Sequence, residues 1–130
     1  MTADFNPEEK LVRACWPSWI KRNGKVSTTA FVPREIDGKM EGISVTRTHT
    51  RTLDETIKAM KPCFRPNSPF AYVTVSACHG IGVYIKYSPN ARNRYHSELY
   101  SNPPDTPLTP EERKRLAETA IVYTVNVESA

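Results

Sequence analysis

A thiol, an imidazole and a carboxylate in the second half of the chain have the residue types that nucleophilic chemistry needs. Cys78 precedes His79 at the end of an apolar run, and His96 and Glu98 follow in a polar stretch. An imidazole can deprotonate a thiol to a nucleophilic thiolate, and a carboxylate can orient that imidazole. Cys78, His96 and Glu98 are therefore a candidate catalytic triad. The competing interpretation is that Cys78 is a small buried residue and His96 a hydrogen-bonding loop residue.

Aromatic and basic side chains are mixed in two segments, one near the N-terminus and one in the polar stretch. Arginine binds phosphate oxygens and aromatic rings stack on bases, so this mixture is typical of proteins that bind single-stranded nucleic acid. The same residue types also anchor protein interfaces. Burial in the core is the competing interpretation for the two tryptophans. The candidate binding residues are Trp16, Trp19, Arg92, Arg94, Tyr95 and Tyr100.

The sequence lacks the local motifs that fix a metal, a nucleotide or a catalytic serine. Its three cysteines, Cys15, Cys63 and Cys78, form no CxxC pair, and its three histidines are dispersed. It has no phosphate loop, dinucleotide-binding fingerprint, nucleophile elbow or HExxH helix. We therefore predict no metal site and no cofactor, and we favour a non-catalytic protein over an enzyme.

Length, charge and hydropathy narrow the class of protein. A chain of 130 residues, 38% hydrophobic and 25% charged, has the size and composition of one globular domain. The net charge is +4, and residues 13–51 hold eight Lys or Arg against three acidic residues. This excess suits an anionic partner, although scattered basic residues are also typical of a solvated surface.

No apolar run approaches the roughly 18 residues of a membrane-spanning helix. The odd cysteine number and the polar first ten residues predict a cytoplasmic protein without membrane contact.

Capping signals and side-chain periodicity predict the elements of the first half. An Asn-Pro-Glu-Glu start indicates one helix, and a Thr-Leu-Asp-Glu capping box indicates another. Runs of β-branched residues indicate two strands, which we expect to pair as a hairpin with a long loop. Asn-Gly and Asp-Gly pairs at 23–24 and 37–38 indicate turns. The predicted elements are a helix over 7–15, strands over 26–32 and 42–47, and a helix over 53–61.

The second half contains the two most apolar runs of the chain and a further capping box. Residues 70–76 and 80–87 predict strands that pair as a hairpin, with the turn around His79. Residues 88–109 are polar and rich in Pro and Asn, which predicts a long surface loop. A Thr-Pro-Glu-Glu capping box starts a helix at 110 that buries Leu116, Ala117 and Ala120, and alternation over 121–127 indicates a terminal strand.

Strands and helices that come in runs, without strict alternation, predict a single α+β domain over residues 1–130. We expect a mostly antiparallel sheet of about five strands, with about three helices packed on one face. The favoured function is a small binding or accessory protein that acts through a protein partner. Two alternatives stay open: a Cys/His-dependent hydrolase or transferase, and a weakly basic protein that binds single-stranded nucleic acid. The oligomeric state is not indicated by the sequence.

Overall fold

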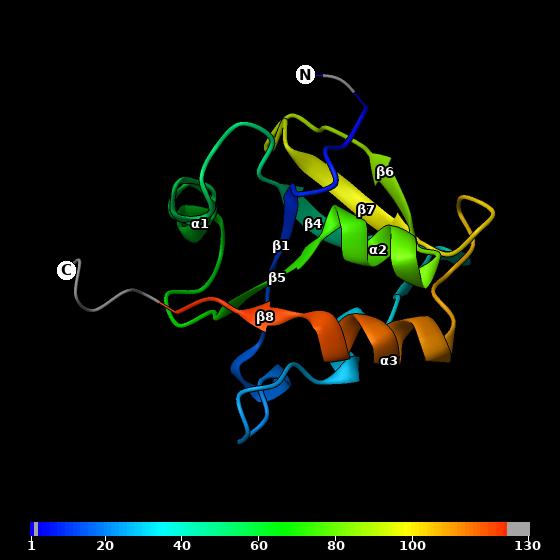
Figure 1. Cartoon of the computed structure of the whole chain (residues 1–130), viewed down its shortest axis with the longest axis horizontal. Helices are drawn as coiled ribbons and strands as arrows, with labels where there is room; N and C mark the ends of the chain where they lie inside the picture. The colour runs from blue at the N-terminus through cyan, green and yellow to red at the C-terminus, as the bar shows by residue number, and fades with distance from the viewer. Residues whose placement is uncertain (2, 125–130) are drawn as a thin grey trace.

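An antiparallel sheet of six strands forms the centre of the protein (Figure 1). The computed structural model describes residue 1 and residues 3–124. The strands of the main sheet lie in the order β6-β7-β4-β1-β5-β8, and every neighbouring pair is antiparallel. They are β1 (Lys10–Ala14), β4 (Ile43–Arg47), β5 (Phe70–Thr74), β6 (Tyr84–Tyr87), β7 (His96–Tyr100) and β8 (Ile121–Val122). The predicted α+β class is confirmed, with one strand more than expected in the main sheet.

Helices and short helical turns connect these strands. The α-helices are α1 (Leu53–Met60), α2 (Val75–Ile81) and α3 (Pro110–Thr119). The 3₁₀ turns are η1 (Pro17–Trp19), η2 (Thr28–Phe31) and η3 (Lys61–Cys63), and a small hairpin joins β2 (Glu35–Ile36) to β3 (Lys39–Met40). No helix within the described part of the chain is both long enough and apolar enough to span a membrane.

The helices cover both faces of the sheet, whereas the sequence predicted one. Neighbouring residues of a strand point to opposite faces, and Leu11 and Val12 belong to two separate apolar clusters. Leu11 belongs to the large cluster that contains Cys78 of α2 and Leu116 of α3. Val12 belongs to a smaller cluster with residues of α1. The α2/α3 face therefore carries the main core, and α1 packs on the opposite face, as Figure 1 shows.

The predicted helix over residues 7–15 is wrong, because most of this segment forms the strand β1. The capping signal is used for a single turn, in which the Asn6 side chain accepts a hydrogen bond from the backbone N–H of Glu8 at 2.9 Å. Beyond that turn, Leu11 and Val12 are both buried on opposite sides, between β4 and β5. Burial of adjacent residues suits a central strand covered on both faces. Pairing with β4 and β5 therefore stabilises this segment as a strand more than the local capping signal stabilises it as a helix.

The predicted strand over residues 26–32 is also wrong. Ser27 caps the 3₁₀ turn η2 by accepting from the backbone N–H of Thr29, and this turn packs against α3. The strand over 42–47 is confirmed as β4, but it pairs with β1 and β7 and not with residues 26–32. Both predicted turns are confirmed: Gly24 and Gly38 adopt positive φ.

Two further corrections concern the second half. The predicted hairpin over 70–87 is wrong, because β5 and β6 lie far apart in the sheet and α2 connects them. Thr74 caps α2 and Gly82 ends it with a φ of +94°, so the residues expected to form a tight turn are helical. The predicted loop over 88–109 is wrong for 96–100, which form β7 with Ser97 and Leu99 buried.

The two helices predicted from capping boxes are confirmed. In α1 the partners are Thr52 and Glu55, and in α3 they are Thr109 and Glu112. The three residues expected to be buried by the last helix are buried. Of the strand predicted over 121–127, residues 121 and 122 form β8. Residues 125–127 of that prediction lie outside the described residues.

Candidate binding site

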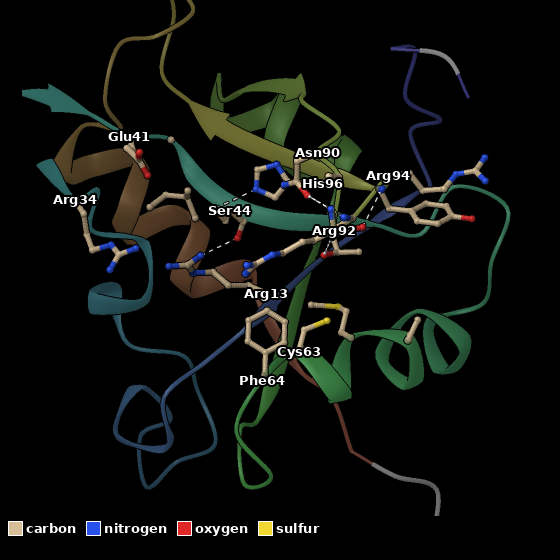
Figure 2. Close-up of a pocket in the computed structure, with 18 of the residues that line it drawn as sticks. Arg13, Arg34, Glu41, Ser44, Cys63, Phe64, Asn90, Arg92, Arg94 and His96 are labelled. Carbon is tan, nitrogen blue, oxygen red and sulfur yellow. Dashed lines mark hydrogen bonds between the residues drawn. The ribbon is translucent and has the colours of Figure 1, made fainter. Parts of the chain in front are cut away.

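A cavity of about 920 Å³ lies on the α1 face of the sheet (Figure 2). On this face α1 covers β1 and β5, through contacts of Ile57 and Met60 with Val12 and Phe70. The part of the sheet formed by β4 and β7 forms one wall of the cavity, with Ser44, Thr46 and His96 among the lining residues. Its other walls come from η1, from residues 32–34 and 41–42, from the end of α1 with η3, and from residues 90–95.

Five arginines and a single glutamate line this cavity. The lining residues with charged side chains are Arg13, Arg34, Glu41, Arg51, Arg92 and Arg94. Three ion pairs form among the described residues, and they involve Arg47, Lys86 and Arg115. Among residues 1 and 3–124, therefore, no carboxylate lies within ion-pair distance of a cavity arginine.

Arg13 occupies a gap between two strands. β1 and β4 are in register only at Leu11–Arg47 and Val12–Thr46, so the strands separate before Arg13. The Arg13 guanidinium fills this gap by donating from Nε to the Ala30 carbonyl at 2.7 Å and from Nη1 to the Ser44 carbonyl at 2.8 Å. Burial lowers the pKa of Arg13, and the nearby positive charge of Arg34 lowers this pKa as well. Arg13 and Arg34 therefore both add positive charge to the lining of the cavity, and the charge of Arg34 acts on Arg13.

A second pair of arginines shares the ring of Tyr95. The guanidinium carbon of Arg51 lies 3.5 Å from the ring centroid, and that of Arg94 lies 5.5 Å from it. Burial lowers the pKa of Arg51, while Tyr95 and Glu55 raise it and the positive charge of Arg94 lowers it further. Stacking on Tyr95 therefore gathers two positive charges on one aromatic side chain.

Side-chain hydrogen bonds fix the segment that carries Arg92. The Asn90 side chain accepts from the backbone N–H groups of Arg92 at 3.0 Å and of Asn93 at 2.8 Å. Asn93 in turn donates to the Thr46 hydroxyl at 2.9 Å, which ties the segment to β4. Figure 2 shows the exposed Arg92 side chain extending into the middle of the cavity toward Arg13. The loop is thus built to hold Arg92 over the β4 wall.

Aromatic side chains line the part of the cavity nearest η1 and η3. Trp16 is 46% exposed and Phe64 is 45% exposed, which is unusual for residues of their size. Trp19 is half-buried, packs against the main core and lies 5.3 Å from the Arg13 guanidinium. The expectation that both tryptophans belong to the core therefore holds for the partly buried Trp19 and is wrong for Trp16.

The structure brings five of the six predicted binding residues to this cavity. Tyr100 does not line it and is buried at the end of β7. The Tyr100 ring packs against Gly42. A Cβ atom at residue 42 would lie 2.6 Å from Cζ of Tyr100, so residue 42 can be only glycine unless the ring shifts. The Tyr100 hydroxyl donates to Glu98 Oε2 at 3.3 Å. The residues brought together are Trp16, Trp19, Arg92, Arg94 and Tyr95.

The three residues of the candidate triad do not converge. Cys78 is buried in the main core with Leu99, whereas His96 and Glu98 alternate with Leu99 along β7 and point to the opposite face. Burial alone raises the pKa of Cys78 to about 12, which opposes thiolate formation. His96 Nδ1 and Glu98 Oε1 both contact the Ser88 hydroxyl, at 3.1 and 3.0 Å. Their shared partner is a serine on the surface side of the sheet and not the thiol.

Sequence reasoning missed three cavity arginines and one buried ion pair. Arg13, Arg34 and Arg51 fall in the basic region 13–51, whose charge excess was the available signal. The buried pair joins Arg47 Nε to Glu9 Oε2 at 2.6 Å across 38 positions of sequence. No local spacing connects these two residues, so this contact could not be found without the fold.

Within the described residues, no group of three or more His, Cys, Asp or Glu side chains is placed to hold a metal ion. The chain was also compared with known proteins. Comparison with family models, with curated proteins and with solved structures finds no match to this chain.

Proposed function

We propose that this protein is a non-catalytic binding protein whose arginine-lined cavity takes single-stranded nucleic acid. The observation that carries the proposal is the concentration of five arginines and four aromatic residues around one open cavity with a single carboxylate. The sequence favours a protein partner and leaves a Cys/His-dependent enzyme and a single-stranded nucleic-acid binder as alternatives. We now favour nucleic acid, and the arginines and aromatic residues around the cavity support this choice.

Arginine is the side chain best suited to phosphate, because its planar guanidinium donates two parallel hydrogen bonds and keeps its charge. The cavity presents arginines in two pairs, Arg13 with Arg34 and Arg51 with Arg94, and Arg92 extends between its walls. Keeping like charges this close is unfavourable for the empty site. A ligand with several negative charges along its length would relieve that repulsion.

Aromatic rings favour single strands over a duplex. Unpaired bases expose flat faces that stack on tryptophan, tyrosine or phenylalanine, whereas paired bases are already stacked on one another. Trp16 and Phe64 offer exposed rings at the cavity, and the concave shape suits a flexible strand better than a rigid duplex.

A protein partner is the second candidate, and one observation favours it. Val32, Ile36 and Met40 are exposed apolar residues on or next to the small β2–β3 hairpin, close in sequence to the cavity residue Arg34. Exposed apolar groups of this size are common at protein interfaces. An acidic protein segment would use the same arginines. The Cys/His alternative is the least favoured, since Cys78 is buried on the other face.

Binding of labelled single strands tests the proposal. Fluorescence anisotropy is measured with oligothymidine and oligouridine of about 12 nucleotides, at several salt concentrations between about 50 and 200 mM. We expect binding that weakens with salt. The Arg92→Ala/Arg94→Ala double variant removes two phosphate contacts, so the slope of log K against log salt should become shallower by about 1.4.

A matched control removes two charges from α3, on the opposite face. Lys114→Ala/Arg115→Ala should bind like the wild type, since both side chains are exposed away from the cavity. Equal loss in both double variants would mean non-specific attraction to net charge. Binding of polyglutamate as tight as that of the oligonucleotides would favour the acidic protein segment, and no binding of either strand would overturn the proposal.

A further inference from the structure

A second, smaller cavity adjoins the first. Its volume is about 500 Å³, within the range of small-molecule sites. The two cavities share Trp16, Cys63 and Phe64 as lining residues, so these three side chains stand at their junction. The second cavity has one charged lining residue, Arg65, against the five arginines of the first. The two neighbouring spaces therefore differ in chemistry: one is cationic and the other is mainly apolar and aromatic.

The aromatic side chains at the junction are held in place from behind. Phe64 follows the 3₁₀ turn η3, and its backbone N–H donates to the Lys61 carbonyl at 3.2 Å. Its ring meets Phe70 edge to face, with centroids 6.2 Å apart and ring planes at 87°. Phe70 is buried in the α1 cluster, so the exposed Phe64 ring rests on a rigid part of the fold.

Trp16 is supported by a cation. The guanidinium carbon of Arg65 lies 4.2 Å from the centroid of the Trp16 ring, at cation–π distance. The preceding residue, Cys15, donates its backbone N–H to the Pro69 carbonyl at 2.8 Å, which fixes the chain on either side of the small cavity. Trp16 nevertheless remains almost half exposed. The exposed Trp16 indole and the exposed Phe64 ring both line the small cavity, which suits it to receive a flat partner.

We propose, resting on the function proposed above, that the second cavity is a subsite for one unstacked base of the bound strand. The phosphates on either side of that base contact the arginines of the first cavity, and the base leaves the stack to lie against Trp16 and Phe64. Stacking on the Trp16 and Phe64 rings needs no hydrogen bond to the edge of the base, so the subsite tolerates different bases.

Strands with and without bases separate the two parts of the site. A thymidine oligomer and an abasic oligomer of the same length carry the same phosphates, so they differ only in the bases that aromatic residues of the site can stack on. Stacking of one base corresponds to about 5- to 150-fold in affinity. We expect the wild type to prefer the base-bearing strand by a factor in this range.

Variants at the junction should abolish that preference. Phe64→Leu and Trp16→Leu keep apolar volume but remove the aromatic face, so each should weaken binding of the thymidine oligomer and leave the abasic oligomer unchanged. Phe64→Tyr and Trp16→Phe restore a ring and should recover most of the preference. Circular dichroism and thermal melting of each variant test whether the fold is retained.

Tryptophan fluorescence gives a second readout that is independent of affinity. In a Trp19→Phe variant, Trp16 is the remaining tryptophan of the chain. Base-bearing strands should quench its emission, and abasic strands should not. Equal affinity for both strands together with unquenched Trp16 would overturn the subsite while leaving the phosphate site intact. Failure of both strands to bind would overturn the proposed function itself.

Discussion

Arginines on the two faces of β4 have opposite environments. On the face toward the main core, Arg47 is fully buried and forms an ion pair with Glu9. On the other face, β4 forms a wall of a cavity with five arginines, none of which has a carboxylate within ion-pair distance among the described residues. A buried charge must be compensated within the protein, whereas charges at an open cavity can be compensated by water or by a ligand. Arg47 is structural, and Arg13 is structural in part through its hydrogen bonds to the Ala30 and Ser44 carbonyls. The exposed Arg34, Arg92 and Arg94 are available for binding.

The Arg47 site shows how completely the protein satisfies a charge that it buries. Glu9 accepts from Arg47 Nε and Nη2, and it also accepts from the backbone N–H of His49 at 2.9 Å. Arg47 further donates to the Asp4 carbonyl at 2.8 Å and lies over the Phe5 ring, 4.1 Å from its centroid. The N-terminal segment is thereby fastened to β4.

The largest effect is expected from Glu9→Gln. This change leaves the Arg47 charge buried without its carboxylate, which costs about 3–5 kcal/mol of unfolding free energy. Urea or thermal unfolding at neutral pH measures it. Glu8→Gln is the matched control, because Glu8 is exposed and the change removes the same charge. A loss below 1 kcal/mol in Glu9→Gln would contradict the comparison, since Arg47 would then not depend on its carboxylate.

Acid should reduce the stability of the wild type through the same pair. Burial raises the pKa of Glu9, but the hydrogen bonds from Arg47 and from the His49 backbone, together with the Arg47 charge, lower it more, so the pKa lies below its ordinary value of 4.5. The folded state therefore binds the proton less tightly than the unfolded chain. The contribution of Glu9 is complete above about pH 4.5 and is lost as the pH falls through the folded-state pKa.

Melting curves of the wild type and Glu9→Gln between neutral and strongly acidic pH measure this dependence. The difference in melting temperature between the two proteins should be constant above the ordinary glutamate pKa and should shrink as the pH falls below it. A difference that does not change with pH would assign the stabilisation to packing and not to the charge of Glu9.

The smallest effect is expected from Arg34→Ala. Arg34 is exposed, and its charge acts against that of Arg13, so its removal should change the free energy of unfolding by less than about 0.5 kcal/mol. The same variant should weaken binding of single strands, because one phosphate contact is lost. Unfolding and anisotropy measurements on one preparation test both statements. A large loss of stability would show that Arg34 is structural like Arg47.

The elements that the sequence predicted correctly are those whose signals are local. The capping boxes at Thr52 and Thr109 place both partners within four residues, so α1 and α3 follow from composition alone. β1 was mistaken for a helix because its start signal is local while its partners, Arg47 and Val73 among others, are distant in sequence. Tertiary pairing decided between two locally acceptable structures.

The candidate site was predicted in its residue types and not in its arrangement. Arg92, Arg94 and Tyr95 are identified because they are neighbours in sequence. The structure adds three arginines from the first half of the chain, namely Arg13, Arg34 and Arg51. The proposed triad failed for a related reason. Sequence order indicates nothing about the face of the sheet on which Cys78 and His96 lie.

The placement of the cysteines has a practical consequence for following the cavity in solution. Cys15 and Cys78 are buried, and Cys63 is exposed at the junction of the two cavities. Burial raises the pKa of Cys15 to about 11 and that of Cys78 to about 12, so both thiols are protonated at neutral pH. A maleimide fluorophore or a fluorinated tag would therefore attach at Cys63 in the native protein. The unmodified sequence thus carries its own attachment point for a spectroscopic probe, located where a ligand would pass from one cavity to the other.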